Sequence, residues 1–356
     1  MKTRYAFFVV SILAVVLLAS CATQGDSTAT EIESTRQVMP VIDPITIRIG
    51  HVTTDNPQHQ TQYGMLAFAD RVRELSGGLM QVRIYPDAAL GSSVDMAHML
   101  LEGTLHMADL ENATMTNFTQ ETMWIDLPYI IQSYEHAEAV FDARSSVSRW
   151  IRPIFAEDGF RILGLYHTGF RHMMNNVRPI NHPSDMDDLT MRVMPSEVMV
   201  ETLRAFGSYA LAAPFADVPN LIRSGNINGH EQPLTNVVQF ADVQPYLSMT
   251  GHFYNPRKFV FSEVLWQQLT PAQQLVIVEA TEYAIGRMNA HHHRNSAILM
   301  QEIIAAGMRV NEISPANMAA FVEAGATVWP LFLESIGSGN AARGSVIIDM
   351  ILSYIP

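Results

Sequence analysis

The stretch LTMRVMPSEVMVETLRAFGSYALAAPFADVPNLIRSGNINGHE, residues 189–231, decides the fold. It reads as strand, helix, strand, helix and strand, because short apolar runs alternate with segments of helical periodicity. Gly207 and Gly225 each follow the last periodic residue of a helix, where glycine commonly ends one. Strands that alternate with helices in this way form parallel sheets. The stretch therefore predicts a βαβαβ unit.

The same pattern occurs earlier in the chain, within residues 45–110. Ser92 and Asp95 have the spacing of a capping box and mark the start of its second helix. Two such units in one chain predict two similar lobes, each built on a parallel sheet. Strands and helices of the earlier unit are expected at residues 45–52, 60–76, 80–86, 92–103 and 104–110.

Two further strands are expected to link the lobes, FRILGLYHTG at 160–169 and MTGHFYNPRKFVFS at 249–262. A helical stretch is predicted from Tyr134 to Asp158. A long helix is predicted from Pro271 to Gly307, because a Thr-Pro pair is typical of a helix start. The cleft between two linked lobes is the default ligand site. The expected boundaries are 44–168 for the first lobe, with about 258–297 returning to it, and 169–257 for the second, with about 298–356 completing it.

The first 21 residues resemble a bacterial lipoprotein signal peptide. A basic start precedes an apolar run, and LASC at 18–21 resembles a lipobox, with Cys21 the only cysteine of the chain. An uncleaved membrane anchor is the alternative, although the run is short for a spanning helix. Residues 22–43 are polar and predict a flexible tether. We therefore expect a periplasmic or otherwise extracytoplasmic protein that a lipid on Cys21 anchors to a membrane.

The composition limits the possible partners. The formal net charge is −13, which argues against nucleic acid or anionic lipid as a partner. Hydrophobic residues make up 48% of the chain, enough to fill the cores of two lobes. An anionic ligand would need a local positive site, because the overall field of the protein repels it.

Arg192 is the first candidate for such a site. It lies in the middle of an apolar strand, and a guanidinium is almost never fully buried unless it is paired. Ligands of parallel sheets bind outside the carboxyl ends of the strands, and a helix with Ser196 as expected N-cap follows here. The planar fork of arginine matches a carboxylate. The residues alone leave open the alternative, an internal ion pair with Asp185, Asp187, Asp188 or Glu197.

Other candidates are weaker. Arg171 directly follows the first crossing strand, beside the expected cleft, although a solvated loop arginine is the simpler interpretation. His291–His293 lie in the long helix, where a metal site needs histidines four residues apart, so we interpret them as a solvated face and expect no metal. No GxSxG, HExxH or CxxC motif occurs, and no acidic pair stands out as a general acid and base. We therefore expect no cofactor and no enzyme.

Several segments together resemble the solute-binding proteins of tripartite ATP-independent periplasmic (TRAP) transporters, of the C4-dicarboxylate-binding type. The likeness covers roughly residues 45–330 and is strongest at APFADVPNLIRSGNINGHEQPLTNVVQF (213–240) and YLSMTGHFYNPRKFVFSEVLWQQL (246–269). It implies an α/β, two-lobed periplasmic-binding-protein-like fold of class II type. Each lobe would be a βαβ sheet with flanking helices, with hinge strands and a long C-terminal helix spanning both lobes. It also implies a subunit that delivers a small organic acid to a membrane permease.

The resemblance implies the ligand contacts as well. Arg192 matches the arginine that clamps the substrate carboxylate, and Arg171 matches a second carboxylate contact. Gln232 stands where the family commonly has an asparagine that touches the ligand, so we expect a reshaped pocket. His106 replaces a usual aspartate and is interpreted as structural. The remaining implied contacts are Phe215, which would pack on the ligand, Glu111 and Asn112 after the third strand, and Ser92 and Ser93 after Pro86.

Two other functions fit the same residues. A receptor that presents its loaded form to a sensor kinase would have the same cleft as a transport subunit. An extracytoplasmic enzyme acting on organic acids would need a nucleophile or a metal constellation in the cleft, which we do not find in the sequence. The acid itself stays open among monocarboxylates, dicarboxylates, keto acids, sugar acids and aromatic acids.

Overall fold

The structure is a computed structural model and describes residues 42–356. Its centre is one sheet of nine strands, in the order β2-β1-β3-β8-β4-β7-β5-β6, with β9 paired to β8. The strands are β1 Ile45–Gly50, β2 Met80–Tyr85, β3 Met107–Glu111, β4 Phe160–Asn175, β5 Thr190–Val193, β6 Tyr209–Ala212, β7 Gly229–Pro233, β8 Tyr246–Ser262 and β9 Arg309–Glu312. The main helices are α1 Gln60–Leu75, α2 Ser93–Leu101, α3 Asn112–Met115, α4 Tyr134–Phe141, α5 Ser146–Glu157, α6 Glu197–Ala205, α7 Val218–Arg223, α8 Glu263–Trp266, α9 Pro271–Ala305, α10 Pro315–Ala326, α11 Trp329–Ile336 and α12 Ala341–Leu352.

Each half of the sheet is a parallel three-stranded unit. Strand β1 pairs in parallel with β2 and β3, and β5 pairs in parallel with β6 and β7. These are the two βαβαβ units that the sequence predicts, and both are confirmed. Helix α2 begins with the expected capping box, in which Ser92 accepts from the amide of Asp95 and the Asp95 carboxylate accepts from the amide of Ser92.

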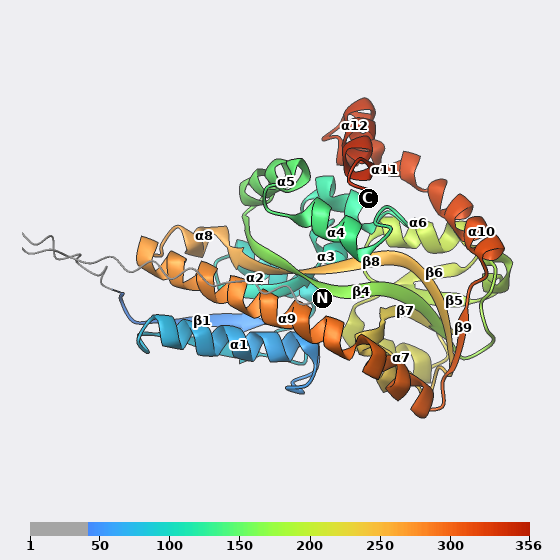
Figure 1. Cartoon of the computed structure of the whole chain (residues 1–356), viewed down its shortest axis with the longest axis horizontal. Coiled ribbons are helices and arrows are strands. Elements are labelled where there is room, and N and C mark those ends of the chain that lie inside the picture. Colours follow the sequence, from blue (N-terminus) through green and yellow to red (C-terminus); the bar gives the residue numbers. More distant parts are fainter. Residues whose placement is uncertain (1–41) are drawn as a thin grey trace, which may run out of the picture. The chain divides into compact units, whose positions relative to one another are not determined.

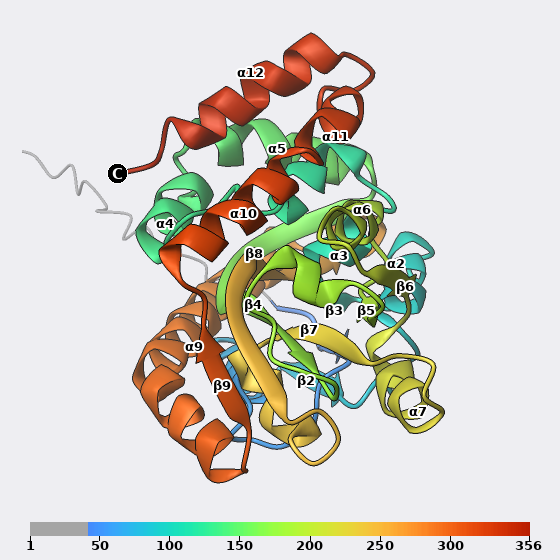
Figure 2. The same ribbon diagram turned by 90° about the vertical axis from the view of Figure 1, so that its right-hand side faces the viewer.

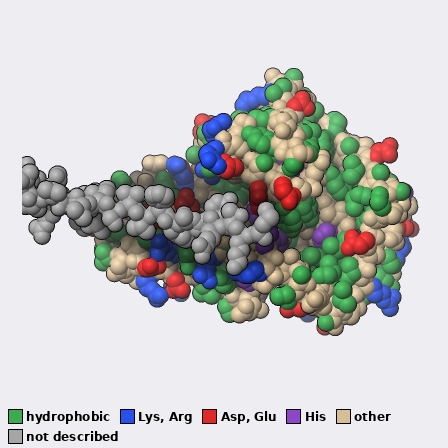
Figure 3. Space-filling model, viewed as in Figure 1, with side chains coloured by type: hydrophobic (Ala, Val, Ile, Leu, Met, Phe, Trp, Pro, Cys, Tyr) green, Lys and Arg blue, Asp and Glu red, His purple; other side chains and the backbone are tan. Residues whose placement is uncertain are grey.

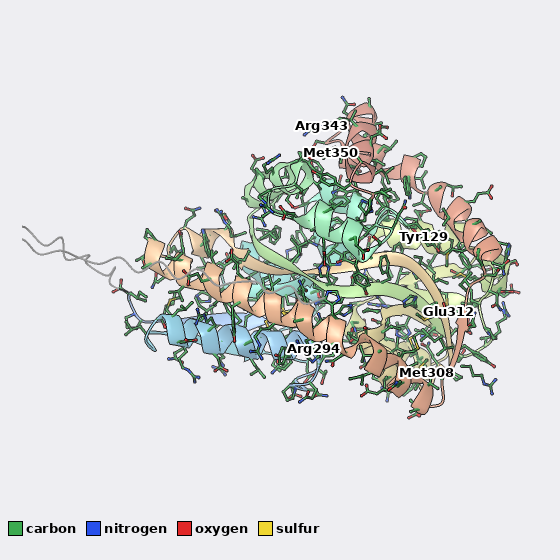
Figure 4. The ribbon with its side chains drawn as sticks, in the orientation of Figure 1. Tyr129, Arg294, Met308, Glu312, Arg343 and Met350 are labelled. Atoms are coloured by element: carbon green, nitrogen blue, oxygen red, sulfur yellow. The ribbon has the colours of Figure 1, made fainter. Side chains whose placement is uncertain are left out.

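Three long elements cross both halves. Strands β4 and β8 are antiparallel to each other, and β8 also pairs with β3 in the first half while β4 pairs with β7 in the second. Figure 2 shows the two strands curving side by side. Helix α9 packs on α1 and β4 and runs along the molecule beneath these strands (Figure 1). Arg294 lies on α9, and Met308 and Glu312 follow in the turn to β9 and at its end (Figure 4).

The structure corrects two predictions of secondary structure. The helical stretch Tyr134–Asp158 is divided into α4 and α5, because Asp142 leaves the helical region and the Ser145 side chain caps the second helix. Strand β4 continues past the predicted end at residue 169 to Asn175. It does so through two register shifts, one of which includes Gly169 at a φ of 89°.

The C-terminal helices complete the described part of the chain. Helix α10 contacts α6 and β8, whereas α11 and α12 pack together over the turn Gln120–Asp126 and against α5. Their apolar side chains surround Trp124, which is fully buried. Within residues 42–356 no single helix is long and apolar enough to cross a membrane, although the bent pair α10 and α11 passes that test together.

Candidate ligand-binding site

A cavity lies where the two halves of the sheet face each other. Its walls come from α2, β3 and β8 on one side and from β4, β5 and β7 on the other. The cavity measures about 50 Å³, which corresponds to roughly three to five water molecules at about 10–15 Å³ each. Seven of the eight predicted contacts line it, namely Ser92, Ser93, Glu111, Arg171, Arg192, Phe215 and Gln232.

Arg192 is buried in the cavity wall with an incomplete set of partners. Its Nε donates to the carbonyl oxygen of Ala213 at 2.7 Å, while its buried Nη1 has no hydrogen-bond partner in residues 42–356. None of the four acidic residues considered as internal partners forms an ion pair with it in this part of the chain. Burial lowers the pKa of Arg192 to about 10, so the guanidinium stays charged at neutral pH.

Arg171 has a different environment. It lies in β4 rather than in a solvated loop, and only 2% of it is exposed. Its Nε pairs with the Glu231 carboxylate, and its Nη2 donates to the Glu231 carbonyl oxygen at 2.7 Å. Glu231 comes from the neighbouring strand β7 and is fully buried. The charge of Arg171 is therefore offset within the protein, although the residue also lines the cavity.

The opposite wall contains three hydroxyl groups and a carboxylate. Ser93 Oγ donates to Glu111 Oε2 at 3.1 Å, and Thr114 Oγ1 donates to Glu111 Oε1 at 2.8 Å. Ser92 Oγ donates to Asp95 Oδ2 at 2.7 Å, beside the capping contacts of α2. The start of α2 thus holds Ser93 against Glu111 at the end of β3, and all three hydroxyls direct their hydrogens toward protein carboxylates.

Arg257 completes this wall and was missed in the sequence. It faces Glu111 across the β3–β8 ladder, where its Nη2 lies 3.3 Å from Glu111 Oε2, and its Nε donates to Asp109 Oδ2 at 2.8 Å. Burial would raise the pKa of Glu111, but the charge of Arg257 and the hydrogen bonds from the Glu111 amide, Thr114 and Ser93 together hold that pKa below the usual value. The signal was an arginine within an apolar crossing strand, the same signal that identified Arg192.

Gln232 and Phe215 lie on the wall that the second half of the sheet, with β4, β5 and β7, contributes. Gln232 Oε1 accepts from Asn236 Nδ2 at 3.3 Å, and Asn236 Oδ1 contacts His59 Nε2 at 3.0 Å. His59 is the N-cap residue of α1, so this chain of contacts joins the two halves across the cavity mouth. Phe215 follows β6 and packs edge-on against Phe240, with ring centroids 6.1 Å apart. His59 and Asn236 also line the cavity and were not predicted.

Residues 49–335 match the model of the bacterial extracellular solute-binding proteins, family 7. The chain belongs to this family. A solute-binding protein of Verminephrobacter eiseniae is 30% identical to it over 294 residues, which are 82% of this chain and 86% of that protein. The 2,3-diketo-L-gulonate-binding periplasmic protein of Escherichia coli is 25% identical over 82% of this chain and 88% of its own length.

Solved structures of TRAP solute-binding proteins have the same fold. One from a Polaromonas species, bound to D-erythronate, superimposes with a TM-score of 0.78 at 26% identity, over 85% of this chain and 98% of its own. One from a Sulfitobacter species, bound to β-D-galacturonate, gives a TM-score of 0.80 at 25% identity, over 87% and 100%. The resemblance to TRAP solute-binding proteins and the two-lobed fold are thus confirmed. Family 7 is a family of extracellular substrate-binding transport components rather than of enzymes.

One expected contact of this solute-binding protein lies beside the cavity rather than in its wall, and one interpretation is wrong. Asn112 does not line the cavity, because its side chain lies between Lys258 Nζ, which donates to it at 3.0 Å, and the Thr122 carbonyl oxygen, which accepts from it at 3.0 Å. His292 is not part of a solvated face, because it is 6% exposed and its Nε2 contacts Tyr134 Oη at 3.0 Å.

The histidines of α9 lie on a face of the molecule that also carries charged side chains. Figure 3 shows histidine side chains gathered near the middle of one face, with acidic and basic side chains interspersed around them. No group of three or more histidine, cysteine, aspartate or glutamate side chains suited to a metal ion occurs among residues 42–356. His106 accepts from the Arg48 amide at 3.4 Å and lies outside the cavity, as a structural residue would.

Proposed function

We propose that this solute-binding protein captures a small organic acid by pairing the acid's carboxylate with Arg192. The buried Nη1 of Arg192 is the observation that carries the proposal, since it is a charged donor without a partner in residues 42–356 on the wall of a cavity. Arg171 and the Gln232 amide lie on the same side and supply further polar groups to the carboxylate. Phe215 offers an apolar surface to the rest of the ligand.

The energetics of Arg192 link binding to closure of the two halves. A buried charge without a counterion costs several kcal/mol, as a rough figure, so the closed arrangement is unfavourable when empty. A ligand carboxylate in the cavity supplies the missing charge and the missing acceptor at once. The ligand therefore shifts the population toward the closed form, which a partner protein can distinguish from the empty one.

Substitution of Arg192 tests the proposal. Arg192→Ala should abolish stabilisation by organic acids, and Arg192→Lys should retain a small part of it, because a point charge replaces a two-pronged donor. Arg204→Ala on α6 is the matched control, since Arg204 is exposed and pairs with Glu201 outside the cavity. Thermal shift over a panel of acids, followed by calorimetry, measures the effect. Undiminished affinity in Arg192→Ala contradicts the clamp.

We also infer that the loaded protein delivers its acid to a TRAP membrane permease and is held near it by a lipid on Cys21. Family membership and the periplasmic relative support the first part. The lipobox-like LASC supports the second, and it lies outside the described residues together with the tether at 22–43. The predicted lobes, 44–168 and 169–257 with their later returns, are in this proposal the bodies that close on the ligand.

A further inference from the structure

The direction of the hydrogen bonds on the first-half wall identifies the groups that this wall can accept. Ser93, Thr114 and Ser92 all donate their hydroxyl hydrogens to Glu111 or Asp95. A hydroxyl whose hydrogen is engaged can offer only lone pairs to a ligand. These three oxygens and the Glu111 carboxylate line the cavity as hydrogen-bond acceptors.

A fourth hydroxyl in the cavity is engaged in the same way. Thr168 Oγ1 donates to the Asn255 carbonyl oxygen at 2.7 Å and accepts from Asn255 Nδ2 at 2.7 Å. Its oxygen therefore also lacks a free hydrogen. The principal donor on this side is Arg257, and Asp109 and Glu111 already share its charge. A ligand group that is only an acceptor would find few partners on this wall.

The pairing of charges leads to the same conclusion. Three arginines line the cavity. Arg171 is paired with Glu231, and Arg257 is paired with both Asp109 and Glu111. Arg192 alone among the three has no carboxylate partner in the described chain. The site therefore has room for one carboxylate at Arg192, while a second one at the other wall would meet Glu111 and be repelled.

We propose that the acid is a hydroxylated monocarboxylate. Its single carboxylate pairs with Arg192, and its hydroxyl groups donate to the acceptor wall of Ser92, Ser93, Glu111 and Thr114. Hydroxyl groups satisfy this wall because they donate to its oxygens and also accept from Arg257. Glu111 is then the residue that selects hydroxyl-bearing acids against dicarboxylates. This inference rests on the proposed function, because it takes the carboxylate at Arg192 as given.

Matched pairs of acids test the inference on the wild-type protein. D-Erythronate and meso-tartrate differ only in whether carbon 4 is a primary alcohol or a carboxylate, and D-gluconate and D-glucarate differ in the same way at carbon 6. Calorimetry should show the monocarboxylate binding at least about 10-fold more tightly within the pair whose length fits. Butyrate, which lacks the hydroxyls of erythronate, should also bind at least about 10-fold more weakly than erythronate.

Glu111→Gln then tests the wall directly. It removes the charge and converts one acceptor oxygen to a donor, so affinity for the preferred hydroxy acid should fall about 10-fold or more while that for the dicarboxylate rises. Glu157→Gln at the exposed end of α5 is the control and should leave both affinities unchanged. Ser93→Ala and Thr114→Val probe the same wall if Glu111→Gln does not fold. Each should lower the affinity for the hydroxy acid more than that for the dicarboxylate.

The outcomes separate the inference from the proposed function. Tighter or equal binding of the dicarboxylate, lost in Arg192→Ala, overturns the inference and leaves the clamp in place. Equal binding of butyrate and erythronate also overturns it. If Glu111→Gln lowers the affinity for both acids equally, Glu111 does not select between them. If no acid of this set binds the wild-type protein, the inference fails, whereas the proposed function fails only if no acid of the wider panel binds.

Discussion

Arg171 on β4 is paired with Glu231 on β7, whereas Arg192 on β5, the strand beyond β7, has no carboxylate partner within residues 42–356. Of these two buried arginines on one wall of the cavity, one is in an internal ion pair and the other, among the described residues, is not. The first belongs to a closed internal pair. The second has no such pair in this part of the chain, and this difference leads to a prediction about stability.

Removing Arg171 should destabilise the ligand-free protein more than removing Arg192. Arg171→Ala leaves the buried Glu231 carboxylate without its counterion, a loss of about 3–5 kcal/mol. Arg192→Met removes an unpaired buried charge and retains most of the side-chain volume, so stability should change by less than about 1 kcal/mol or increase. Urea unfolding without ligand measures both. Equal losses in the two variants would contradict the assignment of roles.

The buried histidines predict a loss of stability in mild acid. Burial, together with Arg171 or Arg192, lowers the pKa of His172 to about 4 and that of His230 to about 3. Their contribution to stability is complete above pH 6.5, the unperturbed value, and is lost as the pH falls toward the folded values, because the unfolded chain takes up the proton first. Each should reduce stability by about 1.4 kcal/mol per pH unit in that range.

A single variant separates this effect from general acid sensitivity. His230→Gln should reduce the slope of the unfolding free energy against pH between about 6 and 5 by about 1.4 kcal/mol per pH unit, the effect of one proton. The exposed His98→Gln should leave that slope unchanged. A slope in His230→Gln that equals the wild-type slope would mean that His230 does not remain neutral in the fold.

Gln232→Asn should change which acid binds more than whether an acid binds. The shorter side chain withdraws from the cavity by one methylene and loses its contact with Asn236, which is 3.3 Å long in the wild-type protein. Arg192 is untouched, so the carboxylate contact persists. A thermal-shift ranking of acids of different length is the measurement, and an unchanged ranking would show that Gln232 does not shape the pocket.

Asn236→Ala should lower the affinity for every acid to a similar degree. The Asn236 side chain contacts Gln232 on one side and His59 on the other, and so holds the two halves together at the cavity mouth. The loss of this side chain destabilises the closed form by about 1 kcal/mol, which corresponds to a several-fold rise in Kd. Calorimetry with two acids of different length checks this, since a loss confined to one acid would indicate a direct ligand contact instead.

Cys21→Ala should release the protein from the membrane without altering its ligand affinity. Cys21 lies outside the described residues, and the cavity is built entirely within residues 42–356. Fractionation of cells that carry the wild-type or variant chain, with immunodetection, measures the distribution. A variant that stays in the membrane fraction would favour an uncleaved anchor over a lipid.

The sequence predicted the two βαβαβ units because their signals are local. Apolar periodicity, the capping pair Ser92 and Asp95, and Gly207 and Gly225 after their helices lie within a few residues of the elements that they define. The break between α4 and α5 was missed because Asp142 and Ser145 interrupt a stretch whose composition is otherwise helical.

The partners of the cavity residues could not be predicted in the same way. Arg257 is held by Asp109 and Glu111, which are far from it in sequence and become neighbours only through the β3–β8 pairing. Within the described residues Arg192 forms no ion pair with Asp185, Asp187, Asp188 or Glu197, and no local pattern shows this. His292 was misjudged because Tyr134, from a distant helix, covers one face of α9.

The pairing of β4 with β8 changes register between His167 and Phe170 and again between Arg171 and Met173. A ladder interrupted at these points bends more easily than a regular one. Arg171 lies between the two shifts and also lines the cavity. In the proposed closure, this part of β4 both lines the cavity and offers a point at which the sheet can bend, so we expect a substitution there to alter specificity and the opening equilibrium together. An engineer who wants to change the ligand alone should work at the ends of α2 and β3, away from this joint.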